Sequence, residues 1–351
     1  MTMYICIAMM PVMVAAFFGD INRSVTVKKK YCIITGILLF SFLALRSRTL
    51  GSTDTTNYYN TMARAINSPS WASFFRPDLY EAGSQFFIWS LSRVFKDPQW
   101  LIVVTSGIYV VSIMFCLWNN SKCIPLALMM YICLGMMSFQ MQGMRQALAM
   151  SICLLAYESA KKRKLIPFVL LVFLAMQFHR TAIVFLPVYL LSGLKFNWKS
   201  IACVMIGCIA ILLISTRVVS IANNLFERDY NNTVSSGGFV ALAIYMIIII
   251  IVPWLTKRTM LESQEVGAFY ILLIGATCYM MRYFGAQAAE RISFYFMFSQ
   301  CIILPNVIVD GRLNSKSRVI ALYIVFFLIV ALNMYRLLGS DMVPYLWFWS
   351  V

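Results

Sequence analysis

A set of arginines, carboxylates and one histidine lies near the ends of apolar runs, on what we predict to be one face of a membrane. Arginine guanidinium groups bind phosphate oxygens and stabilise the charge on a leaving group. A histidine or a carboxylate can accept the proton of an attacking hydroxyl. This combination of side chains therefore points to group transfer from a phosphate-linked donor. The residues are Arg46, Arg48, Asp54, Tyr58, Glu81, Arg145, Gln146, His179, Arg180, Arg282, Glu290 and Arg291.

The stretch 140–182 gives the clearest arrangement of these side chains. Two apolar runs flank a basic segment at 161–164, with Arg145 at the far end of one run and His179 and Arg180 at the far end of the other. A helical hairpin in a bilayer would leave the basic segment in the cytoplasm and bring Arg145, His179 and Arg180 to the opposite face. His179 is the single histidine of the chain. We therefore expect a cationic, proton-exchanging site on the outer side.

Simpler roles are open for each of these residues. His179 at a helix end can bond to a backbone carbonyl, and Asp54 can cap a helix or a turn. Glu290 can pair with Arg291 or Arg282. Arginines near helix ends can also extend to lipid headgroups. The residue types alone do not decide between these roles and catalysis.

The composition requires a membrane protein. The chain has 351 residues, of which 61% are hydrophobic and 12% charged, and its mean hydropathy is +0.79. A soluble domain of this size could not bury so much apolar surface. A span needs roughly 20 apolar residues, and we predict a single all-α polytopic transmembrane domain over 1–351 with about 12 transmembrane helices. The predicted spans are 1–18, 31–45, 100–118, 124–140, 143–160, 165–178, 181–193, 200–216, 239–255, 266–281, 292–309 and 319–335.

The distribution of charge sets the orientation. The net charge is +16, but the cations lie between apolar runs rather than on one basic face, so we expect no nucleic-acid partner. The lysine-rich loop at 23–30 should be cytoplasmic. Alternation then leaves 11 lysines and five arginines inside, and 12 arginines with Lys96 outside. Arginine on the side where topology disfavours cations suggests a forked donor for phosphate or carboxylate. The outer segments include the loop 46–84, with an interfacial aromatic segment at 71–80, and a second loop at 217–238.

One alternative concerns the two short runs 165–178 and 181–193. They could form one long broken span, which would reverse the orientation of everything after them. That reversal would place Lys195, Lys199, Lys257 and Lys316 outside, so we predict two separate runs that meet at His179 and Arg180.

The sequence offers little for a metal or a cofactor. It contains one histidine and no H-E-x-x-H motif, and no phosphate-binding or dinucleotide-binding glycine motif follows a strand. The ten cysteines lie mostly inside apolar runs, where we interpret them as packing residues. A divalent ion held by Asp54 with Glu81 or Glu290 is an alternative, but the arginines favour a site without metal or cofactor.

Four motifs give the chain a resemblance to a known family. They are R-x4-G…D-x3-Y from Arg46 to Tyr58, G-x-R-Q-x-L-A from Gly143, F-H-R-T-A from Phe178, and E-R-x-x-x-Y from Glu290. The chain resembles the EpsG-like branch of bacterial polysaccharide polymerases, the Wzy type that builds O-antigen or exopolysaccharide. One departure is that Gly51 and Asp54 lie one residue further apart than the family pattern.

The resemblance implies a GT-C-like glycosyltransferase in the bacterial inner membrane, active at the periplasmic face. Its donor and acceptor would be undecaprenyl-diphosphate-linked oligosaccharides, and a chain-length-regulating co-polymerase would be its partner. Carried over by position, the resemblance assigns diphosphate binding to Arg145, Arg180 and Arg291, with Arg46 and Arg282 behind them. His179 is the expected general base, with Asp54 and Glu290 as substitutes, and Tyr58 and Gln146 are sugar or phosphate contacts. Two other functions use similar residues, an O-antigen ligase and a flippase or transporter for lipid-linked sugars.

Overall fold

Apolar runs in a bilayer fold into helices because a helix satisfies every backbone hydrogen bond within the segment. The computed structural model describes residues 1–50, 53–214, 217, 238–256, 266–284, 289–338, 340 and 342–350. These residues form helices joined by short turns, with a single isolated β-bridge between Arg46 and Trp347. The predicted all-α class is therefore confirmed.

The helices follow the predicted runs along the chain. They are α1 (Thr2–Phe18), α2 (Val25–Ala44), α3 (Thr53–Asn67), α4 (Trp71–Phe74), α5 (Ala82–Val94), α6 (Gln99–Asn120), α7 (Ile124–Cys133), α8 (Met136–Gln142), α9 (Met144–Lys161), α10 (Leu165–Met176), α11 (Val188–Leu191), α12 (Trp198–Leu213), α14 (Phe239–Leu255), α15 (Gly267–Met280), α16 (Ala289–Met297), α17 (Gln300–Asp310) and α18 (Ser315–Leu337). Short 3-10 helices include η1 (Ile21–Arg23), η2 (Arg180–Phe185), η5 (Met281–Phe284) and η6 (Phe348–Ser350).

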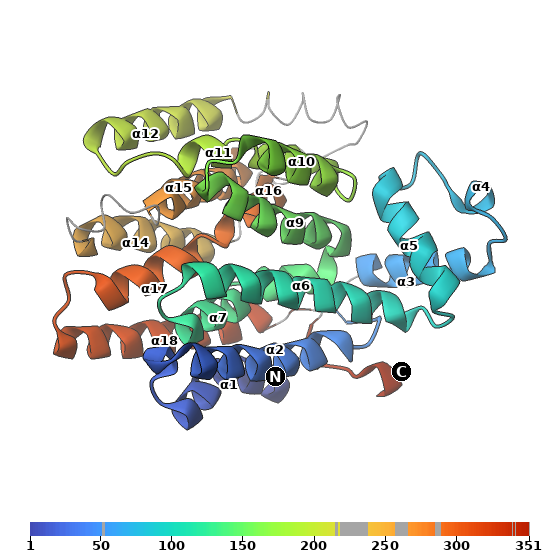
Figure 1. Ribbon diagram of the computed structural model, residues 1–351, viewed down its shortest axis with the longest axis horizontal. Helices are drawn as coiled ribbons and strands as arrows, with labels where there is room; N and C mark the ends of the chain where they lie inside the picture. Colours follow the sequence, from blue (N-terminus) through green and yellow to red (C-terminus); the bar gives the residue numbers. More distant parts are fainter. Residues whose placement is uncertain are drawn as a thin grey trace.

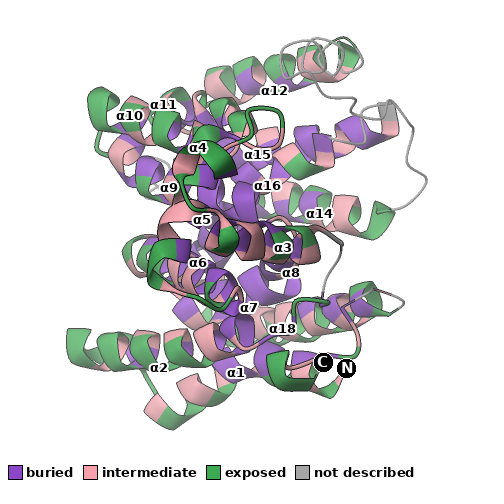
Figure 2. Ribbon diagram, turned by 90° about the vertical axis from the view of Figure 1, so that its right-hand side faces the viewer, coloured by how far each residue is buried: buried purple, intermediate pink, exposed green. Residues whose placement is uncertain are grey.

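The long helices lie side by side, and the segment with α3, α4 and α5 lies at one end of them (Figure 1). Figure 2 looks onto this end and shows buried residues in the centre and exposed ones on the outer helices. Many exposed side chains on the periphery are large and apolar, such as Ile37 on α2, Ile206 on α12 and Phe327 on α18. An apolar periphery of this kind suits contact with lipid.

Each predicted span overlaps a helical segment, but few helices are long enough to cross a bilayer alone. Among the described residues, α6 and α18 meet the length and hydropathy expected of a span. Two further spans result if the bent pairs α7–α8 and α16–α17, with bends of 49° and 41°, each count as one. The structure therefore supports an all-α membrane protein but does not confirm 12 transmembrane helices.

The predicted basic segment and the end of the following run lie together. The guanidinium of Arg163 donates to the carbonyl of Tyr189 at 2.5 Å, and the Tyr189 hydroxyl donates back to the carbonyl of Arg163 at 3.0 Å. The chain therefore runs out along α10, turns at His179 and returns through η2 and α11. This is the arrangement of two separate runs, and not of one long broken span.

The long segment between α2 and α6 is folded around aromatic side chains. Trp71 stacks on Phe75 with ring centroids 5.0 Å apart and meets Trp89 edge-on at 5.8 Å. The predicted helix through Tyr58 and Met62 is present as α3, and both side chains are buried. The second predicted loop, 217–238, lies outside the described residues apart from its two end residues.

Candidate active site

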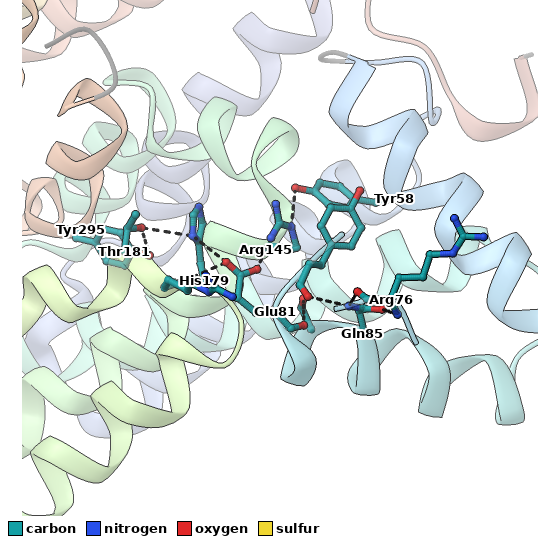
Figure 3. A network of polar contacts seen from close by, with 11 residues as sticks. Tyr58, Arg76, Glu81, Gln85, Arg145, His179, Thr181 and Tyr295 are labelled. Carbon is teal, nitrogen blue, oxygen red and sulfur yellow. Dashed lines mark hydrogen bonds and ion pairs between the residues drawn. The ribbon is translucent and has the colours of Figure 1, made fainter. Parts of the chain in front are cut away.

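The carboxylate of Glu81 lies at the centre of a buried polar cluster (Figure 3). One oxygen, Oε2, is paired with the guanidinium of Arg145. The other, Oε1, lies 3.7 Å from His179 Nδ1 and accepts the backbone N–H of Arg180 at 3.3 Å. Three segments distant in sequence thus converge on one side chain.

Helix ends place these three residues. Gly143 precedes the first residue of α9, so Arg145 lies in the first turn of that helix. His179 has an extended backbone between the end of α10 and the start of η2. Glu81 directly precedes α5, and the next turn is fastened to the end of α10, because the N–H of Ser84 donates to the carbonyl of Gln177 at 3.0 Å.

Two tyrosines complete the surroundings of Arg145. Its guanidinium carbon lies 4.1 Å from the ring centroid of Tyr80, and its Nε donates to the Tyr58 hydroxyl at 3.3 Å. The Arg145 side chain is 11% exposed and that of Glu81 only 5%. A buried ion pair of this kind is costly to break, because removal of one partner leaves an uncompensated charge.

The cluster keeps Glu81 ionised. Burial raises the pKa of its carboxyl, but the charge of Arg145, the neighbouring His179 and backbone N–H donors outweigh burial, so the pKa lies below its usual value. Burial also raises the pKa of the Tyr58 phenol, in spite of Arg145 beside it. A carboxylate beside an imidazole orients the ring and stabilises the imidazolium that forms when the ring accepts a proton. At 3.7 Å the Glu81 carboxylate is a charged neighbour of the His179 ring and not its hydrogen-bond partner. It can stabilise the protonated ring, as the carboxylate beside a general base must do.

A cavity of about 450 Å³ lies beside this cluster and collects several predicted residues. Asp54, Glu290 and Arg291 line it, together with Arg336 from the end of α18. The remaining lining residues are Gly135, Ser138, Phe139, Gln142, Gly143, Phe294, Asn333, Leu337, Ser340 and Met342. Guanidinium groups and carboxylates in one cavity suit a ligand that carries both phosphate and hydroxyl groups.

Hydrogen bonds and helix α3 connect the neighbourhood of the cavity with that of the cluster. The Gln146 side-chain amide donates to the carbonyl of Arg291 at 2.6 Å. The Thr181 hydroxyl bonds to the Tyr295 hydroxyl at 3.2 Å and lies 3.5 Å from His179 Nδ1. Helix α3 contributes Asp54 to the cavity and Tyr58 to the cluster. Both are possible because the two residues lie one helical turn apart.

Other predicted residues have different surroundings. Arg46 is fully buried and donates to the carbonyls of Leu43 at 2.7 Å and Met141 at 3.2 Å, which fastens α2 to α8. Arg282 is paired with Glu290 at 2.8 Å. The Arg180 side chain is exposed, and its backbone N–H contacts Glu81. The structure thus does not bring Arg46 into the cavity, and its predicted role in diphosphate binding stays a prediction.

Sequence reasoning missed the central place of Glu81. It considered Glu81 as a metal ligand beside Asp54 and did not include it among the catalytic residues. The pairing with Arg145 spans 64 positions, and a contact at that separation has no local signature. The same reasoning placed Arg336 among the outer arginines without a role and Tyr80 in the interfacial aromatic segment, and it passed over Asn333.

No group of three or more His, Cys, Asp or Glu residues in the described part of the chain could hold a metal ion.

Comparison with known proteins gives one match. A model of the EpsG family matches residues 29–347, a range that includes the whole cluster and the whole cavity. No curated protein and no solved structure matches the chain.

Proposed function

Because the chain belongs to the EpsG family, which associates it with polysaccharide biosynthesis, we propose that it is a membrane glycosyltransferase that polymerises lipid-linked repeat units. The donor is a glycan on undecaprenyl diphosphate, and the acceptor is the non-reducing sugar of an undecaprenyl-diphosphate-linked repeat unit. The supporting observation is the buried Glu81–Arg145–His179 cluster beside a cavity that contains arginines and carboxylates.

In this mechanism a hydroxyl of the acceptor sugar attacks the anomeric carbon of the donor. The new glycosidic bond forms as the bond between the anomeric carbon and the phosphate oxygen breaks, and undecaprenyl diphosphate leaves. His179 accepts the hydroxyl proton while the Glu81 carboxylate stabilises the imidazolium. Arg291 and Arg180 balance the charge that develops on the diphosphate.

Arg145 acts through Glu81 in this scheme. Its guanidinium is already engaged with the Glu81 carboxylate and the Tyr58 hydroxyl, so we assign it the positioning of Glu81 and not primary contact with diphosphate. Asp54 and Glu290 line the cavity and can orient the acceptor hydroxyls. They also remain the alternatives to His179 as the base.

The same proposal sets the cellular location. The chain would cross the inner membrane 12 times, with the cluster at the periplasmic face and the lysine-rich loops in the cytoplasm, in a GT-C-like arrangement. A co-polymerase would set the length of the product.

The test uses the purified full-length protein in lipid nanodiscs with a synthetic single-repeat lipid-linked substrate. The wild type should convert single repeats into a ladder of longer glycans on lipid diphosphate. His179→Gln should abolish the ladder, because the acceptor proton then has no base. Lys162→Gln, which changes an exposed lysine at the other end of the hairpin, should leave it unchanged.

The outcomes separate the candidate functions. A normal ladder from His179→Gln would return this residue to a helix-end packing role. Transfer of a single glycan to a lipid A core acceptor without any ladder would indicate a ligase. Movement of intact lipid-linked sugar across a vesicle membrane, with no new glycosidic bond, would indicate a flippase.

A further inference from the structure

Helix α18 borders two cavities on the same side of its axis. The polar cavity described above includes Asn333, Arg336 and Leu337 of α18. A second cavity, of about 330 Å³, lies against the earlier turns of α18, where Leu322 and Phe326 line it. The spacing from Leu322 and Phe326 to Asn333 and Leu337 follows the helical repeat, so the four side chains share one stripe.

The opposite wall of both cavities comes from α7 and α8. Leu126 and Met129 of α7 line the second cavity, and Ser138 and Phe139 of α8 line the polar one. The seam between α18 and the bent pair α7–α8 therefore has an apolar cavity towards one end and a polar cavity towards the other. Leu322 and Asn333 are about 16 Å apart along the helix axis at the usual rise per residue.

The polar end of the seam has two arginines available for an anion. The Glu290 carboxylate of the same cavity interacts electrostatically with both Arg291 and Arg336. Its close ion pair is with Arg282, at 2.8 Å, so the guanidinium groups of Arg291 and Arg336 keep donors for a further anion. The guanidinium of Arg336 lies directly over Gly135, whose backbone is left-handed at φ 95°, and a Cβ at this position would overlap it. A glycine thus makes room for the arginine at the bend between α7 and α8.

Asn333 gives an independent indication of a ligand. Its residue is only 4% exposed, and its amide nitrogen Nδ2 has no hydrogen-bond partner among the described residues. A buried amide donor without a partner costs free energy, of the order of 1–3 kcal/mol. The residue lines the cavity beside Arg336, and a rotation of its side chain would let this buried amide donate to a phosphate oxygen there.

We propose that this seam binds an isoprenoid diphosphate lipid, with Arg291, Arg336 and Asn333 around the diphosphate and the second cavity around part of the isoprenoid chain. The proposal rests on the proposed function and deepens it, since it assigns the lipid carrier of that reaction to named residues. The second cavity is lined by apolar side chains such as Val12, Met129 and Phe326, as a hydrocarbon chain requires. The second cavity lies on the same stripe of α18 as the polar cavity that contains the arginines. A lipid with a diphosphate head and a hydrocarbon chain would therefore fit both.

The experiment measures binding rather than polymer formation. Radiolabelled undecaprenyl diphosphate is titrated onto the purified full-length protein in nanodiscs of neutral lipid. Arg336→Gln and Asn333→Leu should each weaken binding, Arg336→Gln by about tenfold or more, because charge-assisted hydrogen bonds to phosphate are lost. Lys316→Gln, an exposed cation in the first turn of the same helix, is the matched control and should bind as the wild type does.

A second pair of variants tests the chain-binding part. Leu322→Trp fills the apolar cavity and should weaken binding of undecaprenyl diphosphate about tenfold, since several buried methylene groups lose their contacts. Geranyl diphosphate is too short to reach that cavity from the arginines and should bind this variant normally. Ile324→Trp, on the exposed face of α18, should change neither affinity.

Each result bears on the proposal directly. Wild-type affinity in both Arg336→Gln and Asn333→Leu would overturn it, as would equal displacement of the probe by phosphatidylglycerol. Equal effects of Leu322→Trp and Ile324→Trp would overturn the part that concerns the chain. If the protein binds the lipid tightly through Arg336 but forms no polymer, the seam is supported and the polymerase function fails. If the protein forms polymer but its Arg336→Gln variant binds normally, the polymerase function is supported and the seam fails.

Discussion

Glu81 has two roles at the scale of the single residue. Its carboxylate fastens α9 and the turn before η2 to the start of α5, through Arg145 and the backbone of Arg180. The same carboxylate gives His179 a negative neighbour. A stabilising role and a catalytic role therefore share one side chain, and a substitution at Glu81 must be measured for both.

We expect Glu81→Gln to be destabilising at neutral pH by about 3 kcal/mol, because Arg145 is then buried without its counter-charge. The folded-state pKa of Glu81 lies below the usual 4.5, so the stabilisation by its charge is complete above about pH 4.5. As the pH falls through the lower folded-state pKa, this stabilisation is lost and the wild type approaches the variant. Unfolding in mixed micelles between pH 3 and pH 7 measures the difference.

The control for this prediction is Asp310→Asn. Asp310 is paired with Lys122 at 2.6 Å, but its side chain is 44% exposed, so the loss should stay below about 1 kcal/mol. Equal losses in the two variants, or a difference between wild type and Glu81→Gln that does not change with pH, would contradict the buried ion pair.

At the scale of the helices, apolar periodicity predicted where the segments lie but not where they bend. The runs 124–140 and 292–309 were predicted as single spans, whereas each is a pair of helices with a bend. The bend at Gly135 depends on a left-handed backbone at one residue. Nothing in an apolar run distinguishes such a glycine from one that continues a helix, because both leave the hydropathy unchanged.

We expect Gly135→Ala to lower the free energy of unfolding by about 1–3 kcal/mol, the usual cost of a strained left-handed residue. The new methyl group would also displace the Arg336 guanidinium, so undecaprenyl diphosphate should bind more weakly. Gly207→Ala is the matched control, because a Cβ there has nothing within 4 Å and lies inside α12. It should be neutral or slightly stabilising. The same loss in both variants would mean that Gly135 has no special conformation.

The candidate site shows the same limit of sequence reasoning. Arg145, His179 and Tyr58 were predicted to lie on one face, and the structure brings them around one carboxylate. Glu81, the common partner of Arg145 and His179, follows an aromatic stretch with no helical or motif signal of its own. Its place depends on how the segment 46–84 folds back over the ends of α9 and α10, which is a matter of tertiary packing.

At the scale of the whole molecule, the lysine-rich loops and the candidate site lie at opposite ends of the helices. Lysines gather at one end, where Lys28 donates to the carbonyl of Trp118 at 3.0 Å and Lys122 pairs with Asp310. The Glu81 cluster and the polar cavity lie at the helix ends opposite to these lysines, since α9 begins near Arg145 and ends at Lys161. The positive-inside rule therefore predicts that the cluster lies at the outer face, as the proposed function requires. Composition predicts this polarity, but it does not decide how many of the shorter helices cross the bilayer.

The hairpin of α10 with η2 and α11 gives a decisive test of that polarity. In a background whose ten cysteines are replaced, single cysteines are introduced at exposed positions and labelled in intact cells with a membrane-impermeant maleimide. Gln177→Cys, at the turn before His179, should react, as should Arg76→Cys, whose side chain points away from the cluster (Figure 3). Lys162→Cys and Lys195→Cys should react only after the membrane is opened, because Arg163 contacts Tyr189 and both ends of the hairpin lie together. Reaction of both Lys195→Cys and Gln177→Cys in intact cells would contradict this polarity, because every later helix would then have the opposite orientation. Arg291 and Arg336 would lie on the cytoplasmic side, where a polymerase that acts on exported repeat units could not use them.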